Sequence, residues 1–199
     1  MILNRNRLTG VAIGVAVLIS GCTSSEGNST QQDDVSGDAL TRVDALQSAV
    51  TQWQQSATIA DAHAAAETAL NLVVGPDGPR YGDLDGDSST GGENTAGLLP
   101  GIGGELGLAQ TEPVNDCVEA DVLGGSWEDP AARWSAADDA LAAWSATNNT
   151  MPTLASHPQR IYGWASLTLA SNDLDEAHEY AGHAQIHVDV TVDAVEHCA

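Results

Sequence analysis

Five segments of the chain repeat apolar residues at intervals of three and four positions, which places those residues on one face of an α-helix. The five segments are 38–55, 59–74, 130 to about 148, 156–171, and 172 or 173 to the chain end. Neither alternating strand and helix segments nor a hairpin signal occurs in the sequence. The sequence therefore predicts an all-α bundle of four or five helices.

Helix ends and the longest connection are also marked in the sequence. Gly75-Pro76 ends the second segment, and Asp129-Pro130 supplies an N-cap and a first-turn proline for the third. Residues 75–116 contain glycine at every few positions, so we expect a long Gly- and Asp-rich loop between the second and third helices. The run Val188–Val195 is rich in β-branched residues, which suit a strand, but its spacing favours helix.

The N-terminus has the features of a bacterial export signal. Arg5 and Arg7 precede the apolar run Leu8–Ile19, which is shorter than the roughly 20 residues of a membrane span. The run leads into Ile-Ser-Gly-Cys, which resembles the lipobox of bacterial lipoproteins. The resemblance implies a signal peptide over 1–21 and a lipid-modified, palmitate-bearing Cys22. The alternative is an uncleaved anchor helix, and both interpretations place the rest of the chain outside the cytoplasm.

The remainder divides into a short polar segment and one domain. Residues 22–37 contain almost nothing that a core can bury, which predicts a flexible tether between the lipid and the domain. Residues 38–199 have the length of a single domain.

The expected mature chain is strongly acidic. Removal of 1–21 removes Arg5 and Arg7 but no acid, which leaves four basic against 28 acidic residues and a formal charge of −24. Such a surface repels phosphate backbones and anionic lipid headgroups, which argues against nucleic acid as a partner. It leaves the N-terminal lipid as the attachment to the membrane, and it favours the binding of cations.

Three cysteines allow one disulfide once Cys22 is lipidated. Cys117 and Cys198 are then expected to pair, because two cysteines in an oxidising compartment usually do. The alternatives are two free thiols or half of a metal site.

Acidic residues alternate in the loop segment 81–94, which contains Tyr-Gly-Asp-Leu-Asp-Gly-Asp. Carboxylates at alternate positions of a tight turn converge on one point, where a hard cation such as calcium needs six to eight oxygen ligands. The segment resembles the calcium loops of the EF-hand and dockerin families. The resemblance implies the ligands Asp83, Asp85, Asp87 and the backbone carbonyl of Ser89.

Two positions depart from that pattern. Ser88 stands where these families have a glycine, and Asn94 stands at the twelfth position, so Glu93 or water would complete the ligand shell. The following Gly-Leu-Leu is not the exiting helix of either family, although the combination is similar to a group of uncharacterised bacterial helical proteins. The alternative is an acidic turn that binds no ion.

Histidines on the last helix suggest a second ligand set. His183 and His187 are four positions apart and share a helix face with Glu179, and His63 of the second helix can complete the set across the bundle. His178 and His183 do not form the zinc-protease pattern, because five positions separate them. The alternative is a stripe of partly exposed histidines without a metal.

The sequence lacks the motifs of common enzyme classes, so we expect no enzymatic activity. It has no Gly-x-Ser-x-Gly elbow, Walker loop, dinucleotide fingerprint or Cys-x-x-Cys-His haem site. Five tryptophans mostly fall on helical apolar stripes, which favours core packing over a sugar-stacking platform. They are Trp53, Trp127, Trp134, Trp144 and Trp164.

These observations lead to three hypotheses. The first is a non-enzymatic cell-surface lipoprotein with a calcium-binding helical domain that contacts other envelope or extracellular proteins. The second is a transition-metal binding or delivery protein that uses helix-borne histidines for an ion such as zinc or copper. The third, a hydrolase with an unrecognised site, lacks a nucleophile with a base partner.

Overall fold

The computed structural model describes residues 30–111, 114–151 and 153–196, with side chains from residue 38 onward. The described residues form five α-helices, one 3₁₀ turn and one π-helical turn, and no strand. The all-α prediction is therefore confirmed. The elements are α1 (Thr30–Gln54), α2 (Ile59–Val74), η1 (Leu108–Gln110), η2 (Val118–Leu123), α3 (Pro130–Ala143), α4 (His157–Ala170) and α5 (Leu174–Glu196).

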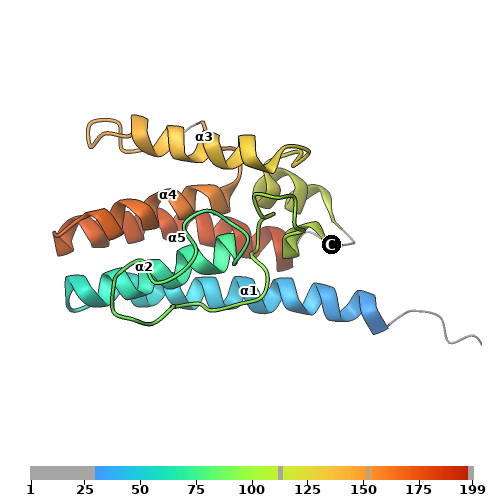
Figure 1. Ribbon diagram of the computed structural model, residues 1–199, viewed down its shortest axis with the longest axis horizontal. Helices are drawn as coiled ribbons and strands as arrows, with labels where there is room; N and C mark the ends of the chain where they lie inside the picture. Colours follow the sequence, from blue (N-terminus) through green and yellow to red (C-terminus); the bar gives the residue numbers. More distant parts are fainter. Residues whose placement is uncertain (1–29, 112–113, 152, 197–199) are drawn as a thin grey trace, which may run out of the picture.

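Four of the helices form a bundle, and α3 lies outside it. Helix α1 packs against α2 and α5, and α4 packs against the same two helices from the other side. Short connections at 55–58 and 171–173 reverse the chain, so the members of each connected pair run antiparallel (Figure 1). Helix α3 packs only on α4 among the helices, and the long chain between α2 and α3 covers one side and one end of the bundle (Figure 1).

Local signals set the helix ends close to the predicted positions. Thr58 caps α2 through a reciprocal capping box with Asp61, and Gly75 ends that helix with a positive φ of 65°. Asp129 accepts the backbone N–H of Ala132 and precedes Pro130 at the start of α3, as expected. Helix α5 is continuous through Val188–Val195, so the helical alternative for that run is confirmed.

Two helix boundaries differ from the prediction. Helix α3 ends at Ala143 rather than near residue 148, because Trp144 leaves the helix and packs edge-on against Trp164 and Tyr180. Helix α1 begins at Thr30, so residues 30–37 of the expected tether have a helical rather than an irregular backbone. Extension of a helix costs less than nucleation, so the packed part of α1 supports a polar extension.

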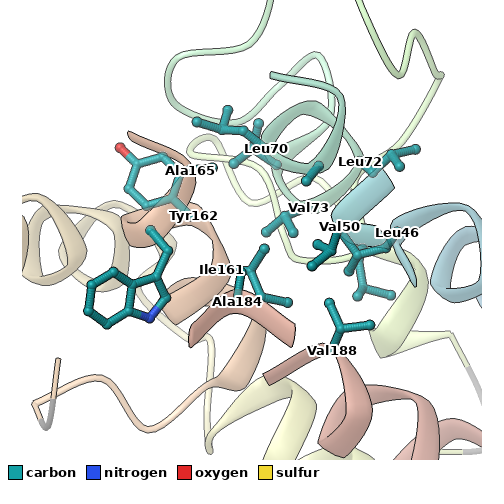
Figure 2. Close-up of a cluster of buried hydrophobic side chains, with 14 of the residues drawn as sticks. Leu46, Val50, Leu70, Leu72, Val73, Ile161, Tyr162, Ala165, Ala184 and Val188 are labelled. Atoms are coloured by element: carbon teal, nitrogen blue, oxygen red, sulfur yellow. The ribbon is translucent and has the colours of Figure 1, made fainter. Parts of the chain in front are cut away.

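Aliphatic and aromatic side chains from all four bundle helices meet in one core. Trp53, Trp127, Trp134 and Trp164 are buried and Trp144 is partly buried, so the predicted packing role of the tryptophans is confirmed. Figure 2 shows the centre of this core. Its labelled residues are Leu46 and Val50 of α1, Leu70, Leu72 and Val73 of α2, Ile161, Tyr162 and Ala165 of α4, and Ala184 and Val188 of α5.

Several expectations concern residues outside the described ranges. The signal peptide 1–21, Cys22 and Cys198 all lie there. Cys117 is half-buried and directly precedes η2, against which α5 packs, but its pairing with Cys198 stays a prediction. Within the described part of the chain, no helix is both long and apolar enough to cross a membrane.

Candidate metal centre

A buried carboxylate on α2 anchors the acidic loop. Glu67 is only 1% exposed, yet it lies on a helix whose neighbouring buried positions are mostly alanine, leucine and valine. Its Oε2 accepts the backbone N–H groups of Leu84 and Asp85, the latter at 3.0 Å, and its Oε1 accepts that of Gly91 at 2.7 Å. These three bonds compensate for part of the desolvation of the carboxylate and hold both arms of the loop against α2.

The loop itself is a series of tight turns. Asp83 accepts the backbone N–H groups of Gly86 and Ser88, Asp85 accepts that of Asp87, and Asp87 accepts that of Ser89. Ser88 adopts a positive φ of 74°, so serine takes the left-handed conformation for which calcium loops use glycine. The turns keep the aspartate side chains close to their own backbone.

Two asparagines clamp the ends of the loop to α2. The side chain of Asn71, which is fully buried, donates to the carbonyls of Gly82 and Gly91 and accepts the backbone N–H of Gly82. Asn94 donates to the carbonyl of Asn71 at 2.9 Å, and its own backbone N–H donates to the hydroxyl of Tyr81. The position of the acidic turns is therefore fixed from both sides.

Three carboxylates meet where the loop crosses α2. Oxygen atoms of Glu67, Asp83 and Asp85 all lie within 4.8 Å of one another. In the described ranges this is the only group of three or more His, Cys, Asp or Glu side chains with metal-binding proximity. Like charges at this distance repel one another, and a divalent cation removes that repulsion. The triad can hold a metal ion, and its donors are all oxygens.

The observed triad differs in part from the ligand set expected from the sequence. Asp83 and Asp85 come together as expected, but the carboxylates of Asp87 and Glu93 do not belong to the cluster, and the backbone carbonyl of Ser89 stays a predicted ligand. The turn directs the Asp87 carboxylate to its own backbone, and Glu93 lies beyond the point where Gly91 binds α2. Sequence reasoning missed Glu67, although an acid within the buried face of α2 was a usable signal.

The histidines expected in a second site have separate partners. His63 Nε2 lies 2.9 Å from the carbonyl oxygen of Ser171, while Glu179 and His183 both contact the side-chain amide of Asn149. His187 faces His157, which the sequence did not single out. The expected set of His63, Glu179, His183 and His187 is therefore not brought together as one cluster in the described structure.

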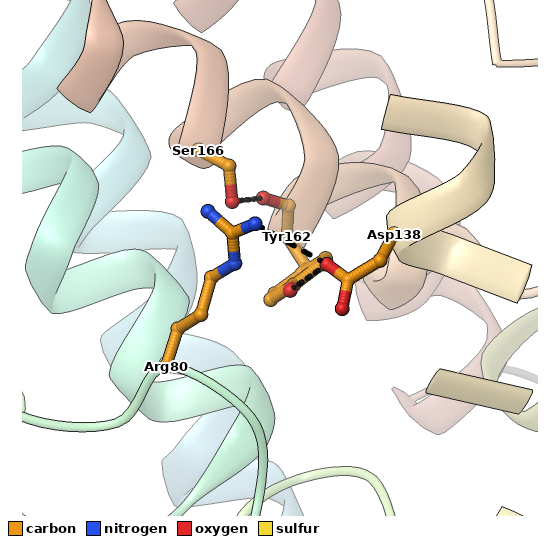
Figure 3. A network of polar contacts seen from close by, with 4 residues as sticks. All are labelled: Arg80, Asp138, Tyr162 and Ser166. Atoms are coloured by element: carbon orange, nitrogen blue, oxygen red, sulfur yellow. Dashed lines mark hydrogen bonds and ion pairs between the residues drawn. The ribbon is translucent and has the colours of Figure 1, made fainter. Parts of the chain in front are cut away.

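A second polar network ties the loop to the outer helix. Figure 3 shows Arg80 beside Asp138 of α3, at 3.4 Å, and the hydroxyl of Tyr162 donating to the same carboxylate at 2.7 Å. Burial raises the pKa of Tyr162 well above its usual value, and the hydrogen bond to Asp138 adds to this effect. Because the guanidinium of Arg80 pairs with Asp138 on α3, Arg80 is not the partner of the carboxylate triad.

In comparisons with known proteins, no protein-family model, curated protein or solved structure matches this chain. The site geometry is therefore the basis for assigning a function.

Proposed function

We propose that the chain is a non-enzymatic, lipid-anchored extracytoplasmic protein in which calcium orders the loop 81–94 against the helical bundle. The supporting observation is the convergence of buried Glu67 with Asp83 and Asp85, whose oxygens lie within 4.8 Å of one another. A calcium ion at this point links α2 directly to the loop. The ordered loop and the acidic surface then serve as an interaction module for another envelope or extracellular protein.

Calcium fits this donor set better than a transition metal does. The three candidate side chains offer only carboxylate oxygens, and calcium accepts six to eight oxygens in flexible geometry. Asp83 is exposed and Asp85 is half-buried, so water can supply the remaining ligands. A shell with so much water implies weak binding, with a Kd on the order of 0.1 to 1 mM, a range that extracellular calcium modules use.

Calcium is expected to raise the Tm of the purified full-length protein. At 10 mM calcium, which is about 10 to 100 times that Kd, the expected stabilisation is about 1.4 to 2.7 kcal/mol. Asp85→Asn should largely abolish this shift because it removes a charge from the triad. Differential scanning calorimetry with and without millimolar calcium measures the effect.

Two matched variants test which carboxylates are involved. Glu93→Gln should keep the calcium shift, since Glu93 lies outside the triad. Asp139→Asn, at an exposed position of α3, should keep it as well. A wild-type Tm that does not respond to millimolar calcium would contradict the proposal. Loss of the shift in Glu93→Gln as well as in Asp85→Asn would instead favour the ligand set expected from the sequence.

The lipid anchor is tested at Cys22. In a bacterial host the wild-type chain is expected in the membrane fraction, with an N-terminal fragment whose mass includes a diacylglycerol group. Cys22→Ala should lose that mass and leave the membrane pellet after a salt wash. Cys117→Ala is the matched control and should remain lipidated. Membrane retention of an unmodified wild-type chain would support the uncleaved anchor instead.

A further inference from the structure

Two histidines from different helices face each other at the end of the bundle near η2. His157 is the first residue of α4, and His187 lies in α5 between the buried residues Ala184 and Val188. Their Nδ1 atoms share a hydrogen bond of 3.1 Å in which either ring can be the donor, and both side chains are half-buried. Neither residue belongs to the carboxylate triad on α2 and the loop.

The separation of the two nitrogens matches that of two neighbouring ligands of one metal ion. Metal–nitrogen bonds are about 2.0 to 2.1 Å long. The two ligating nitrogens are then about 2.9 Å apart when the nitrogen–metal–nitrogen angle is a right angle, and about 3.3 Å apart in a tetrahedral shell. The observed 3.1 Å lies between these limits. We propose that His157 and His187 form a second metal site, which binds a divalent transition-metal ion of the kind that prefers imidazole, such as Cu²⁺, Ni²⁺ or Zn²⁺.

The relative orientation of the rings supports this assignment. The ring centroids are 5.0 Å apart and the ring planes are inclined by 68°. If the two rings lay on one line, the distance between their centroids would be the 3.1 Å between the nitrogens plus one ring radius for each ring. The observed centroid distance of 5.0 Å is shorter than that sum. The rings are therefore bent towards one side, which also suits two lone pairs directed at a common ion once the proton shared in the hydrogen bond has left.

Protonation does not compete strongly with a metal ion here. Burial lowers the pKa of His187 to about 3, and neighbouring His157 adds to this effect. Burial also lowers the pKa of His157, together with Arg160. Both imidazoles are therefore neutral at pH 7, which is the form that binds metals.

The surroundings provide one acid and access to water. Asp121 of η2 acts electrostatically on His157 in the opposite direction to burial, so a negative charge lies near His157. The positive charge of Arg160 repels a bound cation, but the Nε of Arg160 donates to the carbonyl of Leu154 at 2.7 Å. No third His, Cys, Asp or Glu completes a ligand cluster at this pair in the described ranges, so water supplies the remaining ligands.

Metal titration of the purified full-length protein, prepared without a histidine tag and saturated with calcium, tests the site. Calorimetry with Cu²⁺ or Ni²⁺ at pH 7.5 should show one saturable site, and the Cu²⁺ electron paramagnetic resonance spectrum should show coupling to two nitrogens. His157→Ala and His187→Ala should each weaken binding at least about tenfold. Far-UV circular dichroism checks that each variant folds.

Two further variants separate this site from the other histidines. His63→Ala should keep wild-type affinity, because His63 contacts Ser171 in a different part of the bundle. His183→Ala should also keep it, since His183 stacks on Trp164 and contacts Asn149. Full affinity in a folded His157→Ala protein, or a loss in His183→Ala equal to that in His187→Ala, would overturn the proposal.

Discussion

Replacement of Glu67 by alanine is expected to lower the free energy of unfolding by about 3 kcal/mol, even without calcium. Three backbone N–H groups, those of Leu84, Asp85 and Gly91, lose their acceptor, and each unsatisfied buried donor costs about 1 to 3 kcal/mol. The loop is expected to detach from α2 rather than keep these donors buried. Urea unfolding in EDTA, followed by tryptophan fluorescence, measures the loss.

Two controls distinguish the anchoring role of Glu67 from its charge. Glu67→Gln keeps one acceptor oxygen and the side-chain volume, so it should lose less stability than Glu67→Ala but still lose the calcium-dependent rise in Tm. Glu128→Ala, at an exposed position, should change stability by less than about 0.5 kcal/mol. A loss below about 1 kcal/mol in Glu67→Ala would show that the loop does not depend on this carboxylate.

The helices could be predicted from the sequence because their signals are local. The bounds of α2 match the expected segment, since Thr58 and Asp61 form a capping box and Gly75 adopts the conformation that ends a helix. The end of α3 was misplaced because a contact distant in the sequence decides it: Trp144 packs on Trp164 and Tyr180. Boundaries set by tertiary contacts leave no local pattern.

The metal centre could be predicted only in part for the same reason. Asp83 and Asp85 belong to a recognisable turn, whereas Glu67 precedes its three backbone partners by 17 to 24 residues. The histidine spacing correctly placed His183 and His187 one helical turn apart. It did not show that His183 stacks on Trp164 while His187 turns to His157 on α4. Side-chain direction depends on neighbours that the helix period does not specify.

Closure of the long loop depends on a close backbone contact at the end of α2. Gly97 lies so near Val74 that a Cβ atom there would be 2.4 Å from the Val74 carbonyl carbon and oxygen. This approach lets the N–H groups of Leu98 and Leu99 donate to the carbonyls of Leu72 and Val73, at 3.1 and 3.0 Å. The last carbonyls of α2, which a helix cannot satisfy itself, thus bind the returning chain.

Gly97→Ala is therefore expected to lower the free energy of unfolding by about 3 to 5 kcal/mol. Overpacking against backbone that cannot move aside costs about 1 to 3 kcal/mol, and displacement of the two hydrogen bonds adds about 1 kcal/mol each. The displaced segment carries Leu98 and Leu99, which are both buried, so part of the core should open as well. Urea unfolding measures the loss, and hydrogen exchange should show faster exchange of the Leu98 and Leu99 amides.

Gly182→Ala is the matched control, because it makes the same chemical change where space is open. Gly182 lies on the exposed side of α5 with no atom within 4 Å of an added Cβ. Alanine should stabilise the protein by about 0.5 to 1 kcal/mol there, since glycine is the poorer helix former. A loss of stability in Gly97→Ala together with a gain in Gly182→Ala would show that the effect at Gly97 comes from its contact with α2. A stabilising Gly97→Ala would mean that the loop returns along a different path.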